Sequence, residues 1–198
     1  MKKILVLDAC VRREESRTRL LLEEAVSSLR ELHPDWEFEK LTLMDLDLKY
    51  WDTESLKKRD MLLEAKQYDA PVFAYGRQFA QADGVIVAAP FWDLSIPAVL
   101  KVYIENISAE GVTFRCTDKG LEGMCRGKWI LFLTTRGGIW EGSHMEQGSR
   151  YMEAMAEFFG IDRYECVAAD GIDIVELNSK EIMKQALSRT RELCQTLE

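Results

Sequence analysis

The chain has 198 residues, of which 47% are hydrophobic and 30% are charged, and its formal net charge is −8. This length and composition are typical of one globular domain with a single core, so residues 1–198 are treated as one domain. The acidic balance argues against a nucleic-acid partner, and no apolar run approaches the roughly 20 residues that span a membrane.

Cysteine and histidine usage argues against disulfides and metal. The chain has five scattered cysteines without a CxxC pair, which is typical of reduced thiols. Its two histidines, His33 and His144, lie far apart in sequence, so we expect no zinc site. The apolar run Ile4–Leu7 ends at Asp8 and is too short for the core of a signal peptide. We therefore expect a cytoplasmic protein that begins with a strand.

Apolar runs and helical periodicity alternate along the rest of the chain. Strands are predicted near residues 4–7, 36–43, 85–89, 129–133 and 164–168. Helices are predicted after Ser16 to residue 32, over 54–69, from Pro71 to about residue 83, and over 97–107, 151–160 and 182–194. Residues 44–53 are expected to form a loop, and residues 111–127, with four glycines, an extended excursion.

This alternation indicates an α/β domain with a parallel sheet covered by helices on both faces. We predict a three-layer α/β/α sandwich with a flavodoxin-like, five-stranded parallel sheet of order 2-1-3-4-5. A Rossmann domain is disfavoured because residues 8–16 contain no glycine, whereas a dinucleotide site has G-x-G-x-x-G after its first strand.

The stretch from Val85 to Leu94 is the centre of the predicted site. Five small or apolar residues form a strand that Pro90 ends, because proline cannot donate to a sheet ladder. Phe91, Trp92 and Asp93 follow at the carboxyl end of the strand, where open α/β sheets bind ligands. Ser95 and Pro97 are predicted as the cap and first turn of the next helix. The alternative is an ordinary strand–loop–helix connection with exposed aromatic residues.

Two further loops should emerge at the same edge of the sheet. The first, residues 8–19, combines a helix start and two hydroxyls with four arginines and two glutamates, Arg12, Arg13, Arg17, Arg19, Glu14 and Glu15. A helix N-terminus in a basic segment favours phosphate, and the alternative is a solvated helix start capped by Ser16. The other loop, 134–138, offers hydroxyls and paired glycines that let a backbone approach a planar ligand.

These residues resemble a known family. The stretches APFWDLSIPAVLKVYIE, GVTFRCTDKGLEG (residues 111–123) and TTRGGI (residues 134–139) are similar to segments of FMN-dependent NAD(P)H oxidoreductases, the azoreductase and quinone-reductase family. The similarity extends over nearly the whole chain, in order and with matching spacing.

The resemblance implies FMN as cofactor, with NAD(P)H delivering hydride to flavin N5 and a quinone, azo or nitroaromatic acceptor then taking the electrons. It also implies a homodimer with each flavin at the subunit interface. The residues implied to bind the phosphate are Cys10, Ser16, Arg17 and Thr18. Those implied to contact the flavin ring are Pro90, Phe91, Trp92, Asp93, Leu94, Thr135, Arg136, Gly137 and Gly138. The flavin carries the chemistry, so no catalytic acid or base is expected, and His144 is expected to be an exposed surface residue.

Two positions depart from the family pattern. Cys10 replaces the usual serine, and a small buried residue below the loop is the alternative to a phosphate contact. Asp93 replaces asparagine and should lower the flavin potential, unless Asp93 is protonated or turned outward; the alternative is that its carboxylate serves the loop backbone. Two other functions remain open: a flavodoxin-like electron carrier, and a non-enzymatic domain that no longer binds FMN. Without a Rossmann motif, the sequence does not distinguish NADH from NADPH.

Overall fold

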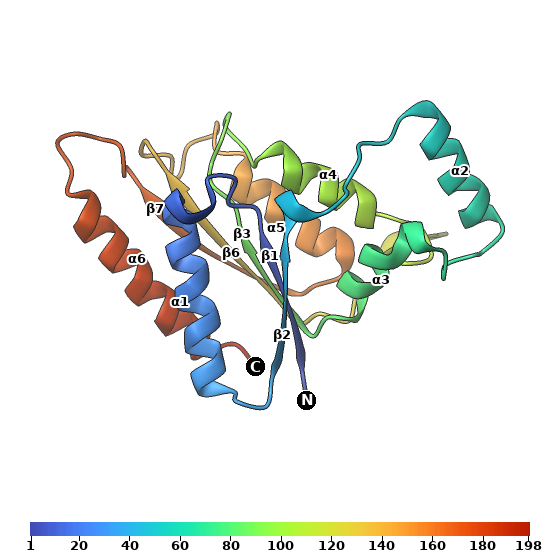
Figure 1. Ribbon diagram of the computed structural model, residues 1–198, viewed down its shortest axis with the longest axis horizontal. Coiled ribbons are helices and arrows are strands. Elements are labelled where there is room, and N and C mark those ends of the chain that lie inside the picture. The colour runs from blue at the N-terminus through green and yellow to red at the C-terminus, as the bar shows by residue number, and fades with distance from the viewer.

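The structure is a computed structural model that describes residues 1–198. Its centre is a parallel sheet of five strands in the order β2-β1-β3-β6-β7 (Figure 1). The strands are β1 (Lys3–Asp8), β2 (Glu37–Thr42), β3 (Gly84–Ala88), β6 (Trp129–Arg136) and β7 (Arg163–Asp170). The predicted order is confirmed, because β6 and β7 are the fourth and fifth strands of this sheet along the chain.

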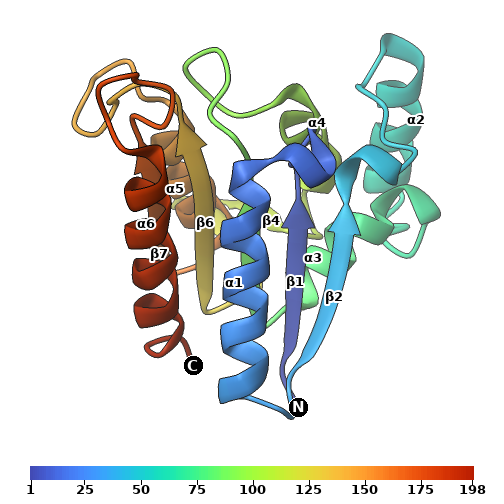
Figure 2. The same cartoon turned by 60° about the vertical axis from the view of Figure 1, so that its left-hand side comes forward.

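Helices cover both faces of the sheet, as Figure 2 shows. One face packs against α1 (Arg17–Leu32) and α6 (Ser179–Cys194). The other packs against α3 (Ala74–Gln81), α4 (Ala98–Ile107) and α5 (Gly148–Phe159). The short helix α2 (Thr53–Glu64) has no buried residue and projects beyond the edge of the sheet (Figure 1).

The alternation of side chains along each strand divides the core into two clusters. Leu5 and Leu7 of β1 belong to the cluster under α3, α4 and α5, and Ile4 and Val6 to the cluster under α1 and α6. The central strand β3 is buried at every residue, as expected for a parallel strand covered on both faces. None of the helices has both the length and the apolar character needed to cross a membrane.

Three local predictions require correction. The excursion over residues 111–127 contains an antiparallel hairpin, β4 (Phe114–Thr117) and β5 (Gly120–Gly123). The predicted helix over 54–69 ends at Glu64. Ser95 does not cap α4, which begins at Ala98 with Pro97 in the capping position. Instead, Ser95 exchanges backbone hydrogen bonds with Trp92 across a tight turn.

Candidate functional site

A cavity of about 150 Å³ lies where the loops after β1, β3 and β6 meet. The loop after β7 completes its wall, which was not predicted from the sequence. The residues that line the cavity are Arg12, Glu15, Ser16, Arg17, Thr18, Pro90, Phe91, Trp92, Thr135, Gly137, Ile172 and Asp173. The carboxyl ends of parallel strands all open at one edge, so β7 was available as a further contributor from topology alone.

The first loop is held from below by a buried carboxylate. Asp8, at the end of β1, accepts a hydrogen bond from the Cys10 backbone N–H at 3.0 Å and pairs with Lys40 at 2.8 Å. The Cys10 side chain is fully buried and directs its thiol toward the Ala88 carbonyl. Burial raises the pKa of this thiol to about 12, so it stays protonated and neutral beneath the loop.

The start of α1 presents backbone donors to the cavity region. Ser16 occupies the capping position, but its side chain makes no capping hydrogen bond. The N–H groups of Arg17 and Thr18 have no acceptor within the chain. The Thr18 hydroxyl lies 2.7 Å from that of Thr135 and so ties the start of α1 to the end of β6. This helix start combines free donors with the positive end of the helix dipole, the arrangement that binds phosphate.

Three of the four arginines in the first loop are already neutralised. Arg17 pairs with Asp173 at 2.6 Å, while Arg13 and Arg19 pair with acidic residues outside the cavity lining. Arg12 makes no ion pair and lines the cavity. It is therefore the cation of this loop that is free to meet an anionic ligand.

The loop after β3 is a tight turn fixed to its neighbour. The Phe91 N–H donates to the Thr135 carbonyl at 3.1 Å. Asp93 and Leu94 have φ angles of 47° and 65°, in the left-handed region, and both side chains are exposed. Neither lines the cavity, and the Asp93 carboxylate accepts no hydrogen bond from the loop backbone, contrary to the alternative role considered for it. Trp92 lines the cavity and is 38% exposed, so part of its indole is accessible from outside.

The loop after β6 approaches the cavity through its backbone. Gly137 lies so close to Asp173 that a Cβ at this position would be 2.6 Å from a carboxylate oxygen. The N–H groups of Gly137 and Gly138 have no acceptor within the chain, although Gly138 does not line the cavity. Thr135 and Arg136 are the last residues of β6, which extends three residues beyond the predicted strand, so the loop itself begins at Gly137. The Arg136 side chain is buried against Asp170 and Glu146 and does not line the cavity.

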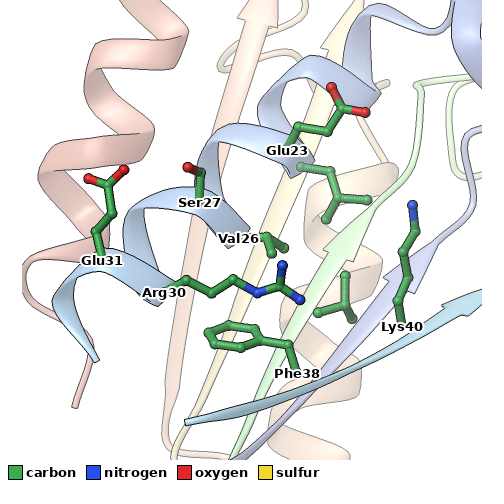
Figure 3. Close-up of a pocket in the computed structure, with 9 residues that line it drawn as sticks. Glu23, Val26, Ser27, Arg30, Glu31, Phe38 and Lys40 are labelled. Carbon is green, nitrogen blue, oxygen red and sulfur yellow. The ribbon is translucent and has the colours of Figure 1, made fainter. Parts of the chain in front are cut away.

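A larger hollow of about 460 Å³ lies between α1 and β2 (Figure 3). Val26 and Phe38 contribute apolar surface to it, and its charged residues are two acids and two bases, Glu23, Glu31, Arg30 and Lys40. Its helical residues come from the middle and end of α1, so no helix N-terminus contributes. We therefore assign the functional site to the smaller cavity, where backbone donors converge.

These features define a class of protein: a doubly wound α/β domain with free backbone donors at a helix start and aromatic and glycine loops at the topological switch point. The family model described as "Flavodoxin-like fold" matches residues 2–193. The chain belongs to this flavodoxin-like family, which also contains FMN-dependent NADH:quinone oxidoreductases and azoreductases.

Three comparisons illustrate the relationship. The chain is 32% identical over 190 residues to "FMN-dependent NADH:quinone oxidoreductase 2" of Clostridium perfringens (strain 13 / Type A), with 96% of each chain covered. It is 32% identical over 196 residues to a protein of the same name from Clostridium acetobutylicum, with 97% of this chain and 98% of the relative covered. The crystal structure of an azoreductase from Bacillus anthracis str. Sterne superposes with a TM-score of 0.90 at 27% identity, with 100% of both chains covered.

Proposed function

We propose that the chain is an FMN-dependent oxidoreductase that transfers hydride from NAD(P)H through flavin N5 to quinones, azo compounds or similar aromatic acceptors. The observation that carries the proposal is the convergence of free backbone donors and the unpaired Arg12 at a cavity beside Phe91 and Trp92. The relatives named as FMN-dependent NADH:quinone oxidoreductases support the same cofactor and reaction.

The donors present fit the phosphate of FMN. The N–H groups of Arg17 and Thr18, the hydroxyls of Ser16 and Thr18, and the Arg12 guanidinium offer it hydrogen bonds and positive charge. The fully buried Cys10 thiol lies beneath this group, so it supports the loop from below.

The other two loops fit the flavin ring. Phe91 and Trp92 offer it aromatic surface, and the Gly137 and Gly138 N–H groups offer donors to its carbonyl edge. When bound, FMN would supply the redox chemistry that links the two substrates. The protein's task is to hold the ring, leave one face accessible and present an apolar surface to a planar acceptor.

A homodimer with the site at its interface belongs to the same proposal. Four apolar side chains on the loops beside the cavity are exposed: Trp92, Leu94, Ile139 and Met145. Ile139 is 65% exposed, which is high for a branched aliphatic residue in an ordered loop. Exposed apolar side chains next to a ligand site favour a surface that a partner covers.

An absorbance spectrum of the purified protein, followed by anaerobic addition of NADH or NADPH and then a quinone, tests the proposal. We expect a yellow protein that bleaches on mixing and is reoxidised by the quinone. Slow bleaching with a well-stabilised semiquinone would favour an electron carrier. A colourless protein that gains no thermal stability from added FMN would refute the proposal.

A pair of neighbouring variants tests the phosphate site. Arg12→Gln should weaken FMN binding about 10- to 100-fold, because a hydrogen bond to a charged group contributes about 1.5–3 kcal/mol. Arg13→Gln is the matched control, since Arg13 pairs with Asp45 and does not line the cavity. Equal affinities of the two variants, measured by flavin fluorescence titration, would contradict the assignment of Arg12.

A further inference from the structure

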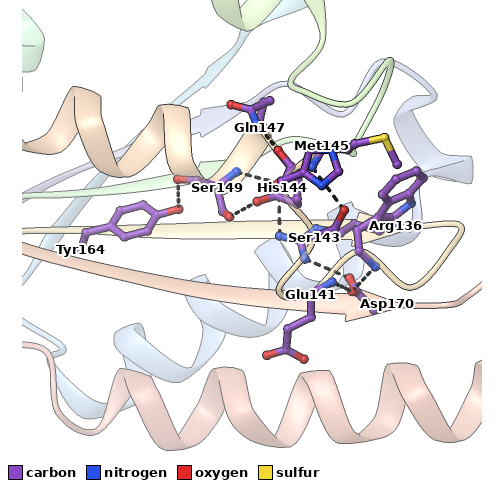
Figure 4. A network of polar contacts seen from close by, with 11 residues as sticks. Arg136, Glu141, Ser143, His144, Met145, Gln147, Ser149, Tyr164 and Asp170 are labelled. Atoms are coloured by element: carbon purple, nitrogen blue, oxygen red, sulfur yellow. Dashed lines mark hydrogen bonds and ion pairs between the residues drawn. The ribbon is translucent and has the colours of Figure 1, made fainter.

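A buried guanidinium lies directly behind the cavity wall. Arg136 is 3% exposed, and the residues on either side of it, Thr135 and Gly137, both line the cavity. Its side chain pairs with Asp170 at 3.1 Å and with Glu146 at 3.4 Å, within the polar network drawn in Figure 4. A charge buried to this extent is expensive to desolvate, and packing alone would not require one at this position.

Arg136 belongs to a closed ring of contacts, here called the Arg136 circuit, whose members are Arg136, Phe91, Trp140 and Asp170. One of these residues forms part of the cavity wall. Its guanidinium lies 5.7 Å from the centre of the Phe91 ring, and that ring lies 5.5 Å from the Trp140 ring. The Trp140 backbone N–H donates to Asp170 at 2.8 Å, and the other oxygen of Asp170 accepts from Arg136. Four residues from three separate segments therefore fix one another, and one of them, Phe91, lines the cavity.

Three further hydrogen bonds connect Asp170, Glu146 and their neighbours to the surrounding loops. Asp170 also accepts the Glu141 N–H at 2.7 Å, so one carboxylate oxygen holds two successive backbone groups of the loop after β6. Glu146, which is 4% exposed, accepts the Ser149 N–H at the start of α5 at 2.9 Å. The Gln147 N–H donates to the Leu94 carbonyl and so joins this loop to the loop after β3.

We propose that Arg136 is a positioning residue for the flavin site, which acts through Asp170 and Glu146 and makes no contact with the ligand itself. The inference rests on the function proposed above and deepens it. Arg136 sets the position of the Phe91 ring and the course of the loop after β6, which together form the walls on which the flavin ring would lie. The Arg136 guanidinium, buried behind the cavity wall, makes directional ion pairs in a low-dielectric environment. Apolar side chains at this position could not make such directional contacts.

Asp170→Asn tests the proposal without altering any residue that lines the cavity. An asparagine cannot accept both loop N–H groups on one oxygen and also receive Arg136 on the other. We expect faster hydrogen exchange over residues 137–147 in the protein without added FMN, and an FMN Kd raised about tenfold or more. Glu165→Gln is the matched control, because it removes another arginine–carboxylate pair on β7, between Arg163 and Glu165 at 3.0 Å, and should change neither quantity.

Arg136→Lys provides a second test of the proposal. It keeps the positive charge but lacks the planar guanidinium that can pair with two carboxylates at once. Combined with Asp170→Asn, it should have a less than additive effect on the FMN Kd, because both changes break one circuit. Wild-type exchange and affinity in Asp170→Asn, or strictly additive effects in the double variant, would overturn the proposal. If the wild type binds no FMN, the proposed function fails, while exchange in the apoprotein still decides whether Arg136 and Asp170 order the loop.

Discussion

Loss of the hydroxyl should have opposite effects on stability at two tyrosines that pack in the same cluster of the core. Tyr103 of α4 is fully buried, and its hydroxyl has no hydrogen-bond partner. The partly buried Tyr164 of β7 donates its hydroxyl to the Ser149 carbonyl at 2.9 Å. Desolvation raises the pKa of both groups above the usual tyrosine range, so both are neutral hydroxyls near neutral pH.

The size of the two effects follows from the cost of an unpaired polar group. Burying a hydroxyl without a partner costs about 1–3 kcal/mol in proteins, so Tyr103→Phe should raise the free energy of unfolding by about 1 kcal/mol or more. Tyr164→Phe removes a formed hydrogen bond and should lower the free energy of unfolding by about 1 kcal/mol. For a chain of this size, 1 kcal/mol corresponds to a shift of about 2–4 °C in Tm.

Urea denaturation of wild type, Tyr103→Phe and Tyr164→Phe, followed by far-UV circular dichroism, measures both changes. The m-values should be equal, so that the midpoints report stability alone. The expected order of midpoints is Tyr103→Phe, wild type, Tyr164→Phe. A Tyr103→Phe variant less stable than wild type would refute the reasoning, because it would mean that the hydroxyl has a bonding partner in the folded protein.

Three further predictions concern the flavin, the hairpin and acid stability. Asp93→Asn should change the flavin midpoint potential by much less than about 30 mV, which corresponds to 1.4 kcal/mol for a two-electron couple, because the Asp93 side chain is exposed and does not line the cavity; a rise of that size in a spectroscopic redox titration would show that its charge lies near the ring. Gly123→Ala should destabilise the protein by about 1–3 kcal/mol in urea, because its Cβ would lie 2.0 Å from the Gly160 backbone nitrogen, and a wild-type midpoint would contradict the close approach. The hydrogen bond from Arg191 lowers the pKa of Glu24, so this pair contributes to stability above the unfolded pKa and loses its contribution as pH falls through the folded value. Glu24→Gln should therefore cost about 0.5–1 kcal/mol near neutral pH and less below about pH 4, and a cost that stays constant with pH would refute the linkage.

The sheet and its order could be predicted from sequence because local patterns and topology agree. The run Val85–Ala89 has no polar face, and the structure buries β3 at every residue. Pro90 marks the end of that strand, and the absence of glycine after β1 favoured the flavodoxin-like order over a Rossmann domain. The meeting of three loops at one edge then followed from the parallel arrangement of the strands, which needs no knowledge of side-chain contacts.

The predictions that were wrong concern features that depend on contacts between residues distant in sequence, or on backbone conformations that residue type does not encode. Ser95 is a residue type that often caps helices. The left-handed conformations of Asp93 and Leu94 instead turn the chain so that the Ser95 N–H donates to the Trp92 carbonyl. Arg136 is followed by two glycines and was predicted to lie in a loop, but it is the last residue of β6, and nothing in the sequence signals that it would be buried. Its partners Glu146 and Asp170 lie 10 and 34 positions away, and only the folded chain brings the three charges together.

The first loop lines the cavity that we propose binds phosphate, but most of its arginines are paired with carboxylates. Its excess of arginine over glutamate suggested attraction for phosphate through side-chain charge. In the folded chain Arg13, Arg17 and Arg19 are each paired with a carboxylate, so most of the positive charge of this loop is neutralised within the protein. What remains for an anion is Arg12 together with the backbone donors at the start of α1. Affinity for phosphate at this site should therefore depend on the path of the backbone more than on the number of arginines, because donors and dipole are fixed by where the helix begins.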